Sequence, residues 1–145
     1  MVRIAVVVGS TRPGRRSRQV AEWVLKHAQE HGGAEFGMLD VADFALPLLD
    51  EPLPPSLGKY QQDHTKRWAA AVKGFDGFIF VTAEYNHSVP GALKNTLDYG
   101  YAEWPFAADF QEYTTFTPSE GAEEALQPLL DQVISWSKAL QTVRS

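Results

Sequence analysis

The chain has 145 residues, of which 44% are hydrophobic and 21% are charged, a composition that is typical of one compact domain and excludes a disordered or fibrous protein. Its formal net charge of −5 argues against general affinity for nucleic acid or anionic membranes. The absence of cysteine excludes disulfides, thiolate metal sites and cysteine nucleophiles. Apolar stretches stay well short of the ~20 residues that cross a bilayer, and no cleavable signal pattern is found, so we expect a cytoplasmic protein.

The first predicted strand is the apolar, β-branched run Arg3 to Val8, which is typical of a parallel strand buried on both faces. Glycines, hydroxyl groups and three arginines follow it between Gly9 and Ser17. An amphipathic helix comes next, with one apolar stripe made of Val20, Trp23, Val24 and Ala28. Because helix N-terminal amides and arginines bind anions, this junction indicates a phosphate-bearing ligand. An ordinary strand-to-helix turn remains the alternative, since the spacing fits neither the P-loop nor the dinucleotide fingerprint.

The middle of the chain continues the alternation of strands and helices. Phe36 to Val41 is a weaker predicted strand, followed by a proline-rich crossing. Helical spacing then recurs in the set Tyr60, His64, Trp68, Ala71, Val72 and Phe75. Phe78 to Val81 is the third predicted strand, and the alternation predicts parallel units with right-handed crossovers. Tryptophans 23, 68 and 136 fall on predicted apolar helix faces, which favours core packing for them.

A second strand-to-helix junction, Ala83 to Tyr99, follows the third predicted strand, and Pro90 with Gly91 opens its helix. In open α/β sheets ligands bind beyond the carboxyl ends of the strands, so we expect a flat cofactor to lie at this turn. The alternative is a structural loop in which Asn86 forms its own turn.

Three segments carry a resemblance to a known family: Gly9-Ser10-Thr11-Arg12, Leu46 to Pro52, and Glu84-Tyr85-Asn86-His87-Ser88-Val89-Pro90-Gly91 with Lys94-Asn95. Together they resemble the NADPH-dependent FMN reductase family, whose members are flavodoxin-like flavoproteins. The resemblance implies a three-layer α/β/α fold with a parallel sheet. Ala83 departs from it, because the family usually has proline there.

The resemblance also implies a cofactor site. Ser10, Arg12, Arg16 and Ser17 would hold the FMN phosphate, with Thr11 in the same site. The isoalloxazine ring would be lined by Glu84, Tyr85, Asn86, His87 and Ser88. Electrons would pass from NADPH or NADH through FMN to a flavin, a quinone or another small acceptor, without a catalytic side chain, because the flavin does the chemistry.

The resemblance further suggests a homodimer or homotetramer, with the region Asn95 to Tyr101 exposed as the subunit contact. A second interpretation is a module without catalysis, either FMN-binding or flavin-free, that acts through oligomerisation.

The C-terminal third is shorter than a flavodoxin-like domain requires. Only Ala102 to Thr117 precede the last helix, where Thr117, Pro118 and Glu120 form a capping box and Pro128 predicts a kink or a restart. We therefore expect one domain, residues 1–145, that is incomplete between about 102 and 117 and lacks the fourth and fifth strands. The third strand would then be an apolar edge, covered by residues 102–117 or by a second chain.

One segment of the sequence matches a known metal-binding pattern. His27 to His31 matches the H-x-x-E-H spacing of some zinc proteases. Histidines at the end of a helix also favour the helix dipole, and no third ligand is evident, so we expect no metal site.

Overall fold

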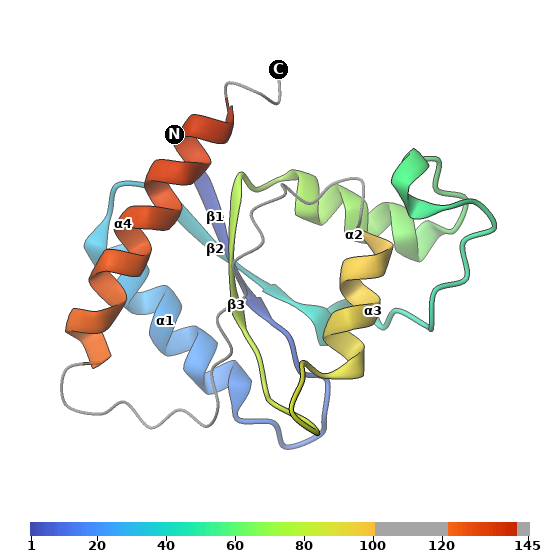
Figure 1. The fold of residues 1–145 in the computed structure, drawn as a ribbon, viewed down its shortest axis with the longest axis horizontal. Coiled ribbons are helices and arrows are strands. Elements are labelled where there is room, and N and C mark those ends of the chain that lie inside the picture. The colour runs from blue at the N-terminus through green and yellow to red at the C-terminus, as the bar shows by residue number, and fades with distance from the viewer. Residues whose placement is uncertain (101–121, 142–145) are drawn as a thin grey trace.

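A computed structural model describes residues 1–100 and 122–141, and its strands form one parallel sheet (Figure 1). The strands are β1 (Arg3–Val8), β2 (Glu35–Asp40) and β3 (Gly77–Val81), in the order β2-β1-β3. Its helices are α1 (Ser17–His31), α2 (Asp63–Lys73), α3 (Gly91–Tyr99) and α4 (Ala122–Gln141), with the short 3₁₀ turns η1 (Val41–Phe44) and η2 (Pro55–Leu57). Predicted and observed strands agree to within one residue at each end.

Successive side chains of β1 point to opposite faces of the sheet, so the strand contributes to two hydrophobic cores, one on each face. Ile4, Val6 and Val8 pack with α1 and α4, whereas Ala5 and Val7 pack on the other face with residues of α2 and α3. All five of these β1 residues are fully buried. The result is the three-layer α/β/α arrangement, with α1 and α4 in one outer layer and α2 and α3 in the other (Figure 1).

The end of β2 lies one residue earlier than predicted. The carboxylate of Asp40 accepts a hydrogen bond of 3.0 Å from the amide of Ala42, and this cap starts η1 at Val41. The next helix is also narrower than its apolar spacing suggests, because α2 spans Asp63–Lys73 and leaves Tyr60 and Phe75 outside it.

Helix α4 runs as one element through Pro128, so the predicted restart is wrong. Its stripe Leu126, Leu130 and Ile134 packs against the core that β3 and α1 share. Trp136 does not belong to that stripe and is 55% exposed, so its predicted core role is wrong. The reason is helical geometry: two residues after Ile134, the helix has turned by about 200°.

Within the described residues β3 pairs only with β1, so it is an edge strand, as the shortened sheet predicts. Residues 102–117 and the capping box at 117–120 lie outside the described residues.

Candidate functional site

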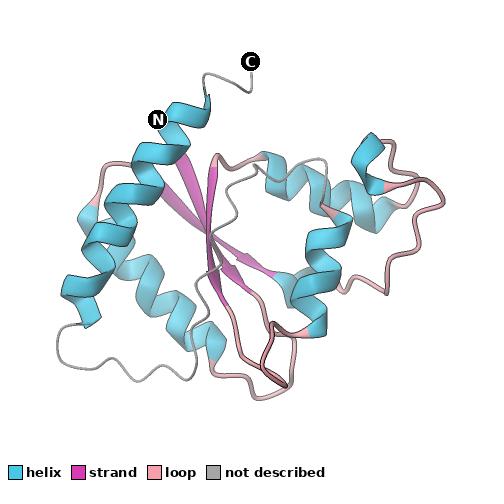
Figure 2. Ribbon diagram, in the orientation of Figure 1, coloured by secondary structure: helices cyan, strands magenta, loops and turns pink. Residues whose placement is uncertain are grey.

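The loops that follow the three strands gather at one end of the sheet (Figure 2). Parallel strands place their carboxyl ends on the same edge, which is where ligands bind in open α/β sheets. The two sequence motifs lie in the first and third of these loops, so the fold brings them to one place.

The loop after β1 begins with a close backbone approach. The Gly9 amide donates a hydrogen bond of 2.9 Å to the Val81 carbonyl at the end of β3. A Cβ at Gly9 would lie 3.0 Å from Leu93 Cδ2 and 3.3 Å from that carbonyl, so glycine is the residue that fits here. The loop then turns over Pro13 and Gly14, where the Arg15 amide donates to the Arg12 carbonyl at 3.1 Å.

The arginines of this loop and of the first turn of α1 divide into two pairs. Arg15 and Arg18 both bind one oxygen of the Asp40 carboxylate, at 2.5 and 2.8 Å. Arg12 and Arg16, which the resemblance assigns to the phosphate, are exposed to solvent. Asp40 thus pairs with Arg15 and Arg18, whereas Arg12 and Arg16 are the pair that the sequence motif singles out.

The start of α1 has unsatisfied polar groups. Its N-cap, Arg16, makes no side-chain cap hydrogen bond, and the first turn holds no acidic residue. The Ser17 hydroxyl is buried and has no hydrogen-bond partner among the described residues. A helix N-terminus with free amides and a spare hydroxyl group fits a phosphate.

The loop after β3 contains a tight reverse turn. The amide of Tyr85 donates to the Ser88 carbonyl at 2.9 Å, and the amide of Ser88 donates back to Tyr85 at 3.2 Å. The two central residues, Asn86 and His87, have positive φ of 54° and 64°. Glu84 supports the turn, because its carboxylate accepts a hydrogen bond of 3.2 Å from the His87 amide. The turn presents residues 84–88 to solvent as one exposed tip.

The hydroxyl of Tyr85 joins the two loops. It lies 3.3 Å from the hydroxyl of Ser10, which is itself buried and accepts from the Arg12 amide at 3.4 Å. The Ser10 hydroxyl, followed by the Arg12 side chain, lowers the pKa of Tyr85 below its ordinary value. The loops after β1 and β3 are thus in direct contact through these side chains.

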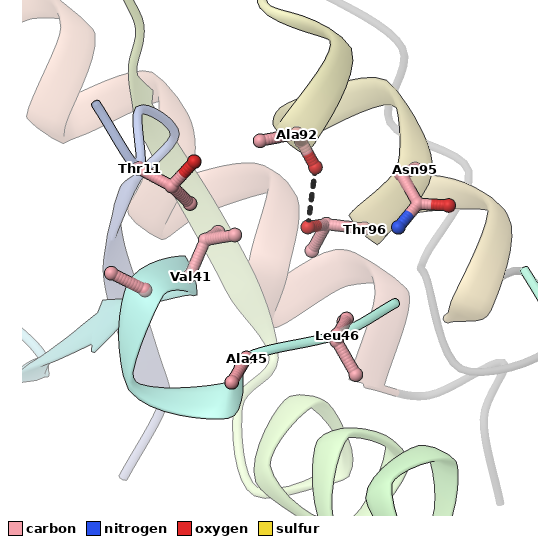
Figure 3. A pocket seen from close by; sticks show the side chains of 8 residues that line it. Thr11, Val41, Ala45, Leu46, Ala92, Asn95 and Thr96 are labelled. Atoms are coloured by element: carbon pink, nitrogen blue, oxygen red, sulfur yellow. Dashed lines mark hydrogen bonds between the residues drawn. The ribbon is translucent and has the colours of Figure 1, made fainter. Parts of the chain in front are cut away.

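A hollow of about 340 Å³ lies between the loops after β1 and β2 and the helix α3 (Figure 3). It is lined by Thr11, Val41, Ala42, Ala45, Leu46, Ala92, Asn95 and Thr96. Of the predicted site residues only Thr11 takes part. The β2 loop was missed because its residues are mostly small and apolar; its position at the carboxyl end of a strand was the signal for it.

The region predicted as an exposed subunit contact is partly buried between Asn95 and Tyr99. Thr96 and Tyr99 are buried, and the amide side chain of Asn95 binds the carbonyl of Pro47 at 2.7 Å and the amide of Leu49 at 3.0 Å. The predicted exposure is therefore wrong for Thr96 and Tyr99. The subunit contact predicted for Asn95 to Tyr101 stays a prediction, and Tyr101 lies outside the described residues.

Two histidines of the H-x-x-E-H pattern face α4 rather than a common point. His31 contacts Gln127 and lies 3.1 Å from the Asp131 carboxylate, while His27 lies 3.5 Å from Glu123. In the part of the chain that the structure describes, no three His, Cys, Asp or Glu side chains could hold one metal ion. Nor does any described helix have the length and apolar character to cross a membrane.

The parallel sheet and its two helix layers define a flavodoxin-like α/β protein. The sequence pattern of the NADPH-dependent FMN reductase family matches residues 2–138, and the chain belongs to that family.

Curated proteins and a solved structure that are similar to this chain are named as FMN reductases, quinone reductases or flavoenzyme oxidoreductases. An NAD(P)H-dependent FMN reductase from a Nectria species is 38% identical, covering 72% of this chain and 55% of that protein. A quinone reductase from Pseudomonas putida is 36% identical, covering 70% and 53%. The structure of FerB, an NAD(P)H:(acceptor) oxidoreductase flavoenzyme from Paracoccus denitrificans, has a TM-score of 0.54 at 25% identity, covering 92% of this chain and 72% of that one. This chain spans about half the length of the two curated relatives.

Proposed function

We propose that this chain binds FMN where the loops after β1 and β3 meet, and passes electrons from NADPH or NADH to a small acceptor. The observation that carries the proposal is the contact between the loops, in which the Tyr85 hydroxyl lies 3.3 Å from Ser10. Because the two motifs lie side by side, one ligand with a phosphate at one end and a flat ring at the other would span both.

The phosphate end of the ligand fits the first loop. Arg12 and Arg16 would supply positive charge, and the unpartnered Ser17 hydroxyl would donate a hydrogen bond. Ser10 would stay bound to the loop, and Thr11 lies beside the neighbouring hollow. These groups suit an anion better than any neutral ligand, since charge-assisted hydrogen bonds are the stronger kind.

The ring end would lie on the tip formed by Glu84, Tyr85, Asn86, His87 and Ser88. The exposed side of this turn would lie against the ring edge and would leave one face of the ring open for stacking. Bound FMN would supply the hydride chemistry between the nicotinamide and the acceptor, so no side chain acts as a nucleophile. We include flavins and quinones as acceptors, because relatives are named for both.

The cellular setting is part of this proposal. A pyridine nucleotide as electron donor supports a cytoplasmic location, and the apolar edge at β3 supports a homodimer or homotetramer. The same edge favours the second candidate function, a flavin-binding or flavin-free module that acts only through oligomerisation.

The test is a titration of the purified chain with FMN, followed by NADPH and NADH oxidation with a quinone or free FMN as acceptor. We expect the protein to become yellow, to protect FMN fluorescence from iodide quenching, and to oxidise one or both nucleotides. FMN binding without oxidation would favour the non-catalytic module. A chain that binds no FMN at any concentration would refute the proposed function.

A further inference from the structure

The carboxylate of Asp40, at the end of β2, holds two arginines of the neighbouring loop. Its side chain is 1% exposed, and one of its oxygens lies 2.5 Å from Arg15 and 2.8 Å from Arg18. Its other oxygen accepts the Ala42 amide at 3.0 Å. Both carboxylate oxygens of Asp40 thus accept hydrogen bonds from the protein, so we expect no direct contact between Asp40 and a ligand.

The charge balance of the first loop explains why such a carboxylate is needed. Arg12, Arg15, Arg16 and Arg18 lie within seven residues of sequence. Like charges this close repel one another, and the carboxylates of Asp40 and Glu22 form ion pairs with Arg15 and Arg18. A buried carboxylate with two guanidinium partners removes part of that repulsion and holds the loop in place.

The ion pairs of Asp40 also affect Arg12 and Arg16, the residues predicted to bind the phosphate, through the backbone of the loop. The Arg15 amide closes the turn by donating to the Arg12 carbonyl at 3.1 Å, and Gly14 adopts the positive φ of 72° that this turn requires. When Asp40 holds the Arg15 side chain, it also holds the turn that presents Arg12. Arg18 lies in the first turn of α1, so its bond to Asp40 sets the position of that helix start.

We propose that Asp40 is a positioning residue for phosphate recognition: it holds Arg15 and Arg18 so that Arg12, Arg16 and the start of α1 remain open to the phosphate of FMN. This inference rests on the proposed function. Asp40 contacts no part of the flavin itself; it acts through the two arginines.

The test compares FMN with riboflavin, which lacks the phosphate, in D40N and the wild-type chain. We expect D40N to bind FMN about tenfold more weakly and riboflavin with unchanged affinity, since a charge-assisted hydrogen bond is worth about that factor. A merely structural role would weaken both flavins together. D43N is the matched control, because it removes an exposed carboxylate from the same η1 turn, and it should bind both flavins as the wild type does.

A second variant covers the case in which D40N fails to fold. R15Q breaks one of the two ion pairs from the more exposed side, and we expect the same selective loss of FMN. The D40N/R15Q double variant should lose less than the sum of the two single losses, because both remove one interaction.

Three results would overturn the inference. They are equal losses for FMN and riboflavin, tighter FMN binding by D40N, and fully additive losses in the double variant. A wild-type chain that binds neither flavin would instead overturn the proposed function, and this inference with it.

Discussion

Tyr85 contributes to the site in two separate ways. Its backbone closes the tight turn after β3, and its hydroxyl reaches the first loop at Ser10. The sequence motif predicts a residue that lines the flavin ring, whereas its hydroxyl group lies at the phosphate loop. One residue therefore belongs to both loops of the proposed site.

Arg12 is the residue whose removal should most directly weaken phosphate binding. R12A should lower FMN affinity by about 1.5–3 kcal/mol, the usual value of a hydrogen bond to a charged group. Riboflavin affinity should not change, because riboflavin has no phosphate. Fluorescence titrations with both flavins measure the difference.

K59A serves as the control for R12A, since it removes the same charge from an exposed position on the proline-rich crossing. If K59A and R12A lowered FMN affinity equally, long-range charge rather than a phosphate contact would explain the effect. An R12A variant with wild-type FMN affinity would remove Arg12 from the site.

Tyr99 makes folding sensitive to high pH. Burial, followed by its hydrogen bond to the Asp50 carboxylate at 2.8 Å, raises the pKa of Tyr99 to about 12, above the ordinary value of 10.0. Because the folded state holds this proton more tightly, the stability it contributes is complete below pH 10 and is lost as the pH rises through 12.

We expect the free energy of unfolding to fall between pH 10 and 12 in the wild type, and to fall less in Y99F. Urea unfolding at several pH values measures this, and the ultraviolet absorbance of tyrosinate follows the titration directly. Identical pH profiles for the two proteins would show that Tyr99 does not carry the dependence.

Among the elements, α4 depends most on a single small residue in the sheet. A Cβ built on Gly77 of β3 would lie 2.1 Å from the Ser137 hydroxyl, so this glycine lets the helix approach the strand. The next atom of Ser137, its Cβ, would lie at 3.4 Å, an ordinary contact distance. The close approach therefore depends on the two residues as a pair.

G77A should lower the free energy of unfolding by about 1–3 kcal/mol, the usual cost of overpacking. The double variant G77A/S137A should recover most of that loss, because the clashing oxygen is gone. G91A is the control, since nothing lies within 4 Å of a Cβ at that position. Thermal and urea unfolding compare the four proteins, and a double variant no more stable than G77A would contradict the packing argument.

At the scale of the whole molecule, the backbone groups on the outer edge of β3 pair with no strand among the described residues. Each buried backbone group without a partner costs about 1–3 kcal/mol, and Ile79 and Val81 are buried on this strand. We expect residues 102–117 to cover the edge or a second copy to pair with it.

We expect this chain to bind FMN more weakly than the Nectria relative, because β3 has no described strand beside its outer edge. Parallel FMN titrations of the two proteins measure the difference. Hydrogen exchange of the β3 amides at several protein concentrations distinguishes residues 102–117 from a second copy as the partner of this edge. Pairing with a second copy gives protection that rises with protein concentration. A monomer with unprotected β3 amides and FMN affinity equal to the relative's would refute this view.

The positions of the loops after β1 and β3 could be predicted from sequence, because each follows an apolar strand and opens a helix. The residues between β2 and α3 that line the hollow could not, since Val41, Ala45 and Leu46 carry no chemical signature. Their place in the site follows from the strand order, which brings the loop after β2 beside Thr11. The exposure of Trp136 was likewise mispredicted, because an apolar residue near a buried stripe need not belong to it.

Local sequence patterns specify the elements of this protein, since β-branched runs form strands and apolar stripes form helices. The partners of the four arginines between residues 12 and 18 depend on the fold. Adjacent guanidinium groups are alike in sequence, but β2 ends where Asp40 reaches Arg15 and Arg18 and leaves Arg12 and Arg16 in solvent. Contacts between residues far apart in the chain assign a charge its partner, and sequence order alone cannot specify them.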